Sequence, residues 1–163
     1  MKNYSGYLIK VMLPVSAFLL LLLQCGKNES PKIENTKEEL ARIIFYDSLG
    51  NKNIDIIAEI VSDEYHRAKG LMFRENLPDN QGMFFIFDDE SPRNFWMKNT
   101  KISLDIVFLD VALKIIKIHK NTAPLSEQLY PSRKPAKYVI EVRSGFTDRY
   151  QVSEGDSVTW QKI

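Results

Sequence analysis

The chain has 163 residues, of which 44% are hydrophobic and 26% are charged, an ordinary composition for a globular protein. This length allows one domain with a modest core and no more. The formal net charge is +1, and the lysines and arginines are scattered rather than arranged in a stripe, so the sequence does not indicate a nucleic-acid-binding protein.

The first segment predicts an export signal rather than part of a fold. Lys2 and Lys10 precede an apolar run over residues 11–23. That length fits the apolar core of a signal peptide. It is shorter than the ~20 residues that a membrane-spanning helix needs, and Pro14 further disfavours such a helix.

Cys25 directly follows this run and is the only cysteine, so it cannot form an internal disulfide. Its position resembles the lipobox of bacterial lipoproteins, although Gln24 stands where a small residue is usual. We expect residues 1–24 to be a lipoprotein-type signal peptide. Acyl chains on Cys25 would hold the mature protein on a membrane of the bacterial cell envelope, outside the cytoplasm. Whether this is the inner or the outer membrane stays open, as do an uncleaved anchor and a coincidental cysteine.

A polar segment separates this cysteine from the folded part. Residues 26–39 contain no apolar periodicity, and such a composition cannot bury enough surface to offset its ordering entropy. We therefore expect residues 25–40 to be a flexible tether and residues 41–163 to be a single domain.

The domain is predicted to consist mainly of strands. Roughly eight short apolar or alternating runs are separated by turn residues, and the run at residues 82–87 has the length of a strand that is covered on both faces. The expected strands are residues 41–47, 53–63, 82–87, 93–97, 102–109, 111–120, 137–145 and 157–163. This pattern predicts an all-β fold: an antiparallel β-sandwich, a jelly-roll-like fold or a partly closed barrel, with one or two short helices.

An aromatic and polar cluster stands at the entrance to the strand at residues 102–109. If side chains alternate, either Trp96 or Met97 faces outward. An outward Trp96 beside Lys98, Asn99 and Thr100 would form a platform of the kind that binds sugars. The alternative is that Trp96 belongs to the core and that Lys98–Thr100 is an ordinary turn.

Asp105 lies inside the same strand, on the face of Ser103 and Val107. A carboxylate in a low-dielectric position needs a cation or a hydrogen-bond donor. We expect it either to form a structural ion pair or to serve a site.

The sequence favours no metal, cofactor or nucleophile. The two histidines, His66 and His119, lack ligands at familiar spacing. Paired-carboxylate chemistry could use Asp105 with Glu141, but Glu141 shares a face with Val139 and Arg143 and is expected to face solvent. Catalytic residues therefore stay unassigned.

Several blocks are similar to the signature of the family called domain of unknown function 192. They are Gly70-Leu71-Met72 with Arg74, Gly82-Met83-Phe84, Phe95 to Thr100, Leu104-Asp105, Tyr138 to Val142 with Gly145, and Gly155-Asp156. Ser103 and Val111–Leu113 depart from the family, which commonly has a proline and a glycine turn there. The resemblance implies a compact β fold and no particular activity, and such proteins are often exported or lipid-anchored.

Carried over by position, the polar or aromatic signature residues are Arg74, Trp96, Lys98, Asn99, Asp105 and Glu141, and we take them as candidate binding residues. We further expect Arg74, Lys98 and Asp105 to lie together. The first functional reading is a monomeric, lipid-anchored module that binds an envelope component such as a glycan and is not an enzyme. The alternatives are an envelope-sugar hydrolase or lyase using Asp105 and Glu141, and a structural or assembly lipoprotein.

Overall fold

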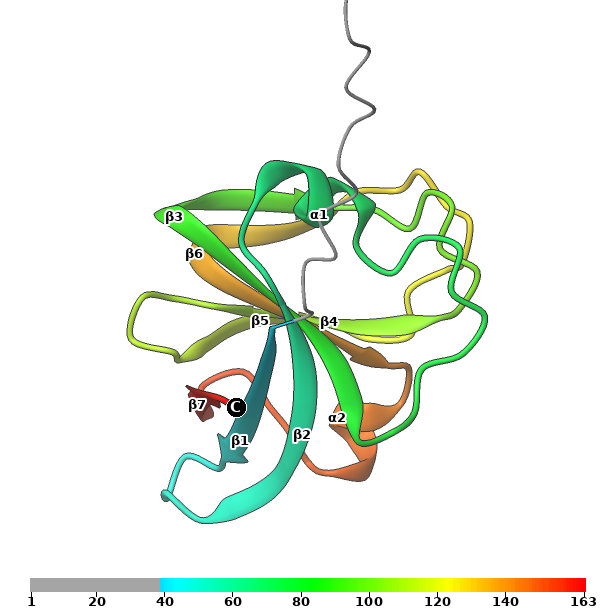
Figure 1. Cartoon of the computed structure of the whole chain (residues 1–163). Helices are drawn as coiled ribbons and strands as arrows, with labels where there is room; N and C mark the ends of the chain where they lie inside the picture. The colour runs from blue at the N-terminus through cyan, green and yellow to red at the C-terminus, as the bar shows by residue number, and fades with distance from the viewer. Residues whose placement is uncertain (1–38) are drawn as a thin grey trace, which may run out of the picture. The chain divides into compact units, whose positions relative to one another are not determined.

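The computed structural model describes residues 39–163 as one curled sheet of seven strands with two very short helices (Figure 1). The proposed signal peptide, Cys25 and nearly all of the proposed tether lie outside the described residues. The strands are β1 (Leu40–Tyr46), β2 (Lys52–Val61), β3 (Gln81–Phe95), β4 (Leu104–Leu109), β5 (Ile115–His119), β6 (Tyr130–Arg143) and β7 (Ser157–Lys162), and the helices are α1 (Glu64–Lys69) and α2 (Phe146–Arg149). Neither helix in residues 39–163 is long and apolar enough to cross a lipid bilayer.

The strand order in the sheet is β5-β4-β6-β3-β2-β1-β7. All neighbouring pairs are antiparallel except β2 and β3, which are parallel. The all-β prediction is confirmed, but a purely antiparallel sheet was the wrong expectation. The reason is that α1 and residues 70–80 carry the chain back along the sheet, which is the crossover that a parallel pair requires.

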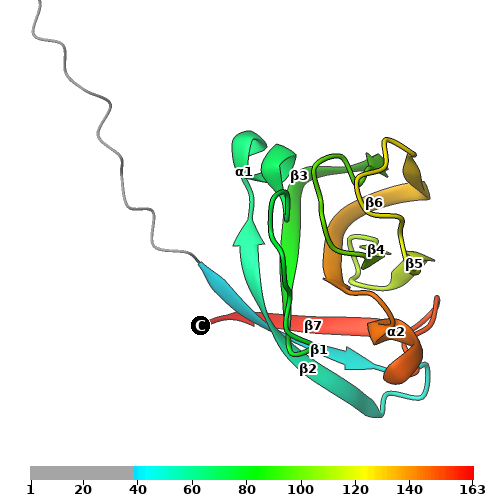
Figure 2. The same ribbon diagram turned by 90° about the vertical axis from the view of Figure 1, so that its right-hand side faces the viewer.

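The sheet is curled into a half-barrel whose outermost strands meet at one end (Figures 1 and 2). Lys114, just before β5, bridges to Ser157 at the start of β7. The Ile115 amide donates to the Asp156 carbonyl at 2.8 Å, and the Val158 amide donates to the Leu113 carbonyl at 2.9 Å. These bonds pair edge groups that would otherwise be open to another chain.

Strands β3 and β6 are longer than the sequence suggested. Residues 88–92 were expected to break the strand that precedes them, and residues 121–136 were expected to be a loop, because both segments contain prolines. In the structure β3 and β6 continue as a two-stranded ribbon, with Ser91 opposite Ala136 and Asn94 opposite Pro131. Register shifts at Ile86/Ser91 and Pro92/Asn94 make this ribbon irregular, which is where strand prolines are tolerated.

Two hydrophobic cores lie on opposite faces of the sheet, as the alternation of side chains requires. The first core includes Phe45, Phe84, Val107, Ile140 and Phe146. The second core includes Leu71, Phe85, Met97, Ile106 and Val139. Consecutive residues of β3, β4 and β6 thus enter different cores, and all six residues of β4 are buried.

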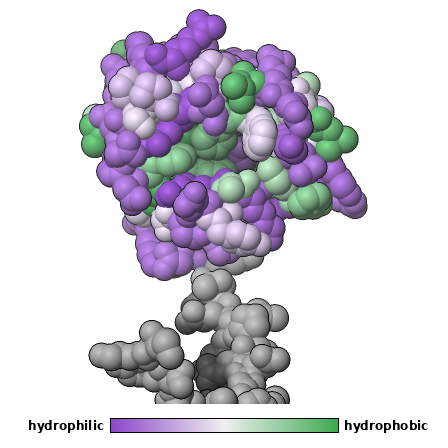
Figure 3. All heavy atoms as spheres, turned by 90° about the horizontal axis from the view of Figure 1, so that it is seen from above, coloured by the Kyte–Doolittle hydropathy of each residue, from purple (hydrophilic) through white to green (hydrophobic). Residues whose placement is uncertain are grey.

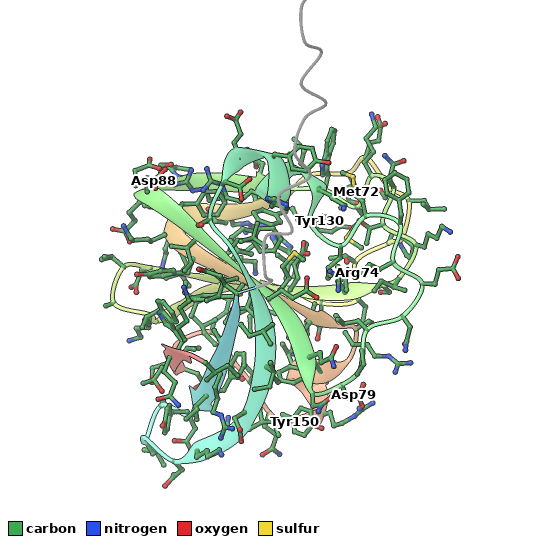
Figure 4. The ribbon with its side chains drawn as sticks, viewed as in Figure 1. Met72, Arg74, Asp79, Asp88, Tyr130 and Tyr150 are labelled. Atoms are coloured by element: carbon green, nitrogen blue, oxygen red, sulfur yellow. The ribbon has the colours of Figure 1, made fainter. Side chains whose placement is uncertain are left out.

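The two ends of the molecule carry different helices. In both ribbon views α1 lies at the upper end and α2 at the lower end (Figures 1 and 2). Figure 4 places Met72 at the α1 end, and Asp79 and Tyr150 at the α2 end. The α1 end is the one that holds the candidate site.

Candidate functional site

Glu141 is a buried carboxyl in the middle of the sheet, with only 5% of its surface exposed. Its cross-strand neighbours are Met83 of β3 and Ile106 of β4. The expectation that Glu141 faces solvent was wrong, because α1 and the segment after it cover this part of β6. Arg143, two residues further along, lies toward the α2 end and is exposed, with its Nη1 atom 3.6 Å from Asp79 Oδ1.

A small pocket opens over Glu141, with a volume of about 40 Å³. Its walls come from α1 and the following segment, from β3 and from the turn after β3. The lining residues are Arg67, Ala68, Lys69, Gly70, Leu71, Met72, Phe85, Phe95, Trp96, Thr100 and Glu141. Seen from the α1 end, this face is hollowed, with apolar side chains in the hollow and polar ones around it (Figure 3).

Gly70 lets the backbone of the covering segment lie directly against the carboxyl. Its φ is +47°, a conformation that side chains other than glycine rarely adopt. A Cβ atom at this position would lie 3.8 Å from Glu141 Oε2 and 3.5 Å from Phe85 Cζ. Any larger residue would therefore carry its side chain into the space around the carboxyl.

Burial raises the pKa of Glu141 to about 8 from its ordinary value of 4.5. The physical cause is desolvation by the apolar side chains around the carboxyl, which disfavours its charged form. Glu141 is therefore mainly neutral at pH 7. A buried acid with a strongly raised pKa in a pocket is a candidate functional group.

The side chains of two of the buried polar residues of the described chain open onto the pocket. The buried polar or charged residues of this part are Thr100, Asp105, Thr122, Ser132, Glu141, Thr147 and Asp156. Five of them have hydrogen-bond partners. Within residues 39–163 no hydrogen bond or ion pair to the side chains of Thr100 and Glu141 is found, and both line the pocket. No fully buried side-chain nitrogen or oxygen of residues 39–163 lacks a hydrogen-bond partner. The polar atoms of Thr100 and Glu141 therefore remain accessible from the pocket, where a ligand can pair with them.

Trp96 forms part of the exposed rim of the pocket. It is 43% exposed, whereas Met97 is fully buried in the second core. Lys98 Nζ lies 5.1 Å from the centre of the Trp96 ring and 3.1 Å from Glu127 Oε1. Of the two arrangements that the sequence left open, the structure shows the outward tryptophan.

Asn99 holds the turn beside this rim rather than reaching into the pocket. Its φ of +58° is left-handed, which asparagine tolerates. Its carbonyl accepts a 2.9 Å hydrogen bond from the amide of Phe73, and the carbonyl of Thr100 accepts one of 2.9 Å from the amide of Leu125. Phe73 is 62% exposed and Leu125 is 65% exposed, so these bonds attach two exposed apolar residues to the turn that follows Trp96. Sequence reasoning did not single out Phe73 or Leu125, because neither belongs to a pattern that predicts exposure.

The charged residues expected to gather do not form one ionic cluster. Arg74 pairs with Glu59 through both guanidinium nitrogens, and Lys98 pairs with Glu127. Asp105 is fully buried and accepts hydrogen bonds from the amides of Asn121 and Thr147 at 2.9 and 3.0 Å.

Asp105 has a structural role instead. It also accepts bonds of 2.7 Å from the Thr147 hydroxyl and 3.3 Å from the Gly145 amide, at the start of α2. Its partners are thus backbone and hydroxyl donors that tie α2 and the segment at Asn121 to β4, rather than the ion-pair partner that the sequence suggested. With these bonds its carboxylate is well satisfied where it is buried.

Asp105 and Glu141 cannot act as a catalytic pair. In the β4–β6 ladder Asp105 lies opposite Val142, whereas Glu141 lies opposite Ile106. Residues directly opposite each other share a face and neighbours alternate, so the two carboxyl groups point to opposite faces of the sheet. The alternative in which these two acids act together is therefore not supported. Among residues 39–163, no group of three or more His, Cys, Asp or Glu residues is arranged to hold a metal ion.

Comparisons with known proteins agree with this fold. The family model DUF192, described as "Uncharacterized ACR, COG1430", matches residues 44–160. A crystal structure from Sinorhizobium meliloti 1021, provisionally named a transcription regulator, is 34% identical with a TM-score of 0.73, covering 76% of this chain and 95% of its own. A protein of unknown function from Novosphingobium aromaticivorans DSM 12444 is 29% identical with a TM-score of 0.70, covering 78% and 89%. No curated protein matches the chain. The match over nearly the whole described part shows that this chain belongs to the DUF192 family.

Proposed function

We propose that this protein is a lipid-anchored, extracytoplasmic binding module whose Glu141 pocket receives part of an envelope component, with a glycan as the ligand class. The observation that carries the proposal is the convergence of Glu141 and Thr100, both buried and without partners in the described chain, on one pocket beside an exposed tryptophan. Specific sites typically combine apolar walls with a few polar groups of this kind.

A glycan suits the shape of this site. Sugar rings present apolar faces, which stack on an aromatic side chain, and hydroxyl or amine substituents, which need polar partners. The pocket volume of about 40 Å³ is far below the ~300 Å³ or more of cavities that enclose a whole small ligand. The ring therefore lies outside against Trp96, and one substituent enters the pocket.

The N-terminal sequence supports the proposed location. The apolar run at residues 11–23 and Cys25 directly after it support export and lipidation. The polar residues 26–39 would give the domain a reach on the order of 20 Å from the membrane. A glycan of the envelope is then within range of the site.

Two other functions fit the molecule less well. A sugar hydrolase using Asp105 and Glu141 is disfavoured because the ladder points the two acids to opposite faces. Nucleic-acid binding, suggested only by the provisional name of the Sinorhizobium protein, lacks a basic footprint because the formal net charge is +1. An assembly role is the remaining alternative, because exposed Phe73 and Leu125 also suit a protein partner.

The test is a binding screen of the chain from Lys27 onward against envelope glycans. Trp96→Ala and Thr100→Val should each weaken any specific binding by about tenfold, as the loss of a ring contact or a buried hydrogen bond does. Leu49→Ala is the control, because Leu49 is 85% exposed in the β1–β2 turn. Equal binding by all four proteins would show that the glycan site lies elsewhere, and capture of a protein but no glycan would support the assembly role.

The anchor has its own test. Cells that express the full chain should incorporate labelled fatty acid into it, and Cys25→Ala should abolish the label, because Cys25 is the only cysteine. Label that persists in the variant would refute the anchor without affecting the pocket.

A further inference from the structure

We infer that the group entering the Glu141 pocket is a primary ammonium group, which rests on the binding function proposed above and specifies the ligand as an amine-bearing glycan. The inference comes from an inventory of donors and acceptors in the pocket. Within the described chain, no N–H group donates to the Glu141 carboxyl, although several elements cover it.

The residues that line the pocket include several hydrogen-bond acceptors. Besides Glu141 and the Thr100 hydroxyl, the last turn of α1 contributes Arg67 and Ala68. The carbonyls of Arg67 and Ala68 accept no hydrogen bond from the described backbone, whereas the next carbonyl on each side, of His66 and Lys69, does. An ammonium group offers three donors and no acceptor, which complements this set.

The walls and the size of the pocket agree with a small cation. The aromatic rings of Phe85, Phe95 and Trp96 line it, and the faces of such rings attract ammonium groups. A volume of about 40 Å³ accommodates a group of the size of one to a few water molecules. An aminomethyl group fits this space, whereas a sugar ring does not.

The charged residues around the pocket do not make it an anion site. Arg67 on α1 donates to the carbonyls of Ser62 and Ile86, and its guanidinium lies 5.0 Å from the centre of the Phe87 ring. Lys69 on α1 is exposed, and Lys98 on the turn pairs with Glu127. The strands β3 and β6 contribute only Phe85, Phe95 and Glu141 to the lining. Burial is the cause of the raised pKa of Glu141.

Binding of an ammonium group would ionise Glu141 and release its proton. With a pKa of about 8, roughly nine-tenths of the carboxyls are protonated at pH 7, so each ligand bound should release about 0.9 proton. For an amine that stays protonated over this range, such as propylammonium, the apparent affinity should then rise about tenfold from pH 6 to pH 7 and level off above pH 8. A neutral hydroxyl would instead bind the protonated acid, release no proton and lose affinity above pH 8.

The first experiment follows the carboxyl carbon of Glu141 by NMR during pH titration of the chain from Lys27 onward, which contains the whole sheet and both cores. Propylammonium chloride is the probe, with 1-propanol as the neutral match and sodium chloride as the control for ionic strength. Propylammonium should lower the pKa of Glu141 by one or more, propanol and salt should leave it unchanged, and Thr100→Val should reduce the effect. An unchanged pKa with propylammonium, or an equal fall with sodium chloride, would overturn the inference.

The second experiment separates this inference from the proposed function. Oligosaccharides with free primary amines are compared with their N-acetylated forms by calorimetry in buffers of different ionisation enthalpy, which counts protons. The amine form should bind about tenfold or more tightly, and Glu141→Gln should remove that preference. Equal binding of both forms would sink the ammonium inference and leave the glycan site standing. A fall in the pKa of Glu141 with propylammonium, but no binding of any oligosaccharide, would support the ammonium site and refute the glycan function.

Discussion

Replacement of Glu141 by glutamine should remove a large pH dependence of stability. The folded protein holds the pKa of this acid at about 8, compared with 4.5 when it is solvated. Between those pH values the unfolded chain has lost the proton and the folded chain has kept it. Because the folded state binds more protons, the free energy of unfolding decreases as the pH rises.

The size of this loss follows from the same two values. Each pH unit between them corresponds to about 1.4 kcal/mol, so Glu141 should cost the wild type about 5 kcal/mol by the time the pH exceeds 8. Glutamine has nearly the same shape but cannot ionise. The free energy of unfolding of Glu141→Gln minus that of the wild type should therefore rise by about 4 kcal/mol between pH 4.5 and pH 8.5, which is large beside a typical total stability of 5–15 kcal/mol.

Urea unfolding of both proteins at a series of pH values measures this difference, and the subtraction cancels the titration of all other groups. The matched control is Glu75→Gln, because Glu75 is exposed and its hydrogen bond to Lys101 lowers its pKa. As the pH rises, the free energy of unfolding of the wild type should increase slightly relative to that of Glu75→Gln. This change has the opposite sign to the one expected for Glu141→Gln. A flat difference for Glu141→Gln would show that the carboxyl is solvated or paired in solution, and the site argument would fail with it.

Three further predictions concern the scaffold around the site. Asp105→Ala should lower the free energy of unfolding by about 3 kcal/mol, because buried donors lose their acceptor. The control Asp88→Ala, at an exposed position, should change this free energy little. Equal effects of the two substitutions in urea unfolding would contradict the structural role of Asp105. Gly82→Ala should lower the free energy of unfolding by about 1–3 kcal/mol, since the new Cβ would lie 2.8 Å from a backbone carbonyl oxygen of β6. The control Gly50→Ala, in open space at a φ of +86°, should lower it by only about 1 kcal/mol in the same assay. Asn99→Gly should leave both the stability and any glycan affinity unchanged, whereas Asn99→Val should lower the melting temperature. A loss of glycan affinity in the glycine variant would instead show that Asn99 contacts the ligand.

Much of the fold could be read from local pattern. The alternation around Asp105 placed Leu104, Ile106 and Phe108 on one face and Val107 and Leu109 on the other, and these two groups do enter different cores. The unbroken apolar run at residues 82–87 indicated a strand covered on both faces, and Gly82 to Phe85 are buried. Such features depend on the period of the backbone, which a sequence displays directly.

The candidate site could be read only in part. The block from Phe95 to Thr100 was identified as a place where an aromatic and polar groups meet, but its alternation could not say whether Trp96 or Met97 faces outward. Glu141 was expected to face solvent because Arg143 shares its face. Which of the two is covered depends on where α1 and the segment after it cross the sheet, and no local pattern encodes that crossing.

By itself the sequence determined that the domain is built of strands, because side-chain alternation and turn residues act between near neighbours in the chain. Only the tertiary structure decided the parallel pairing of β2 with β3, the assignment of Asp105 to the scaffold and the burial of Glu141 in a pocket with Thr100. The physical reason is that the environment of a carboxyl is set by whichever distant segments exclude water from it. For Glu141 those segments come from α1, β3, β4 and the turn after β3, and they meet only when the sheet curls.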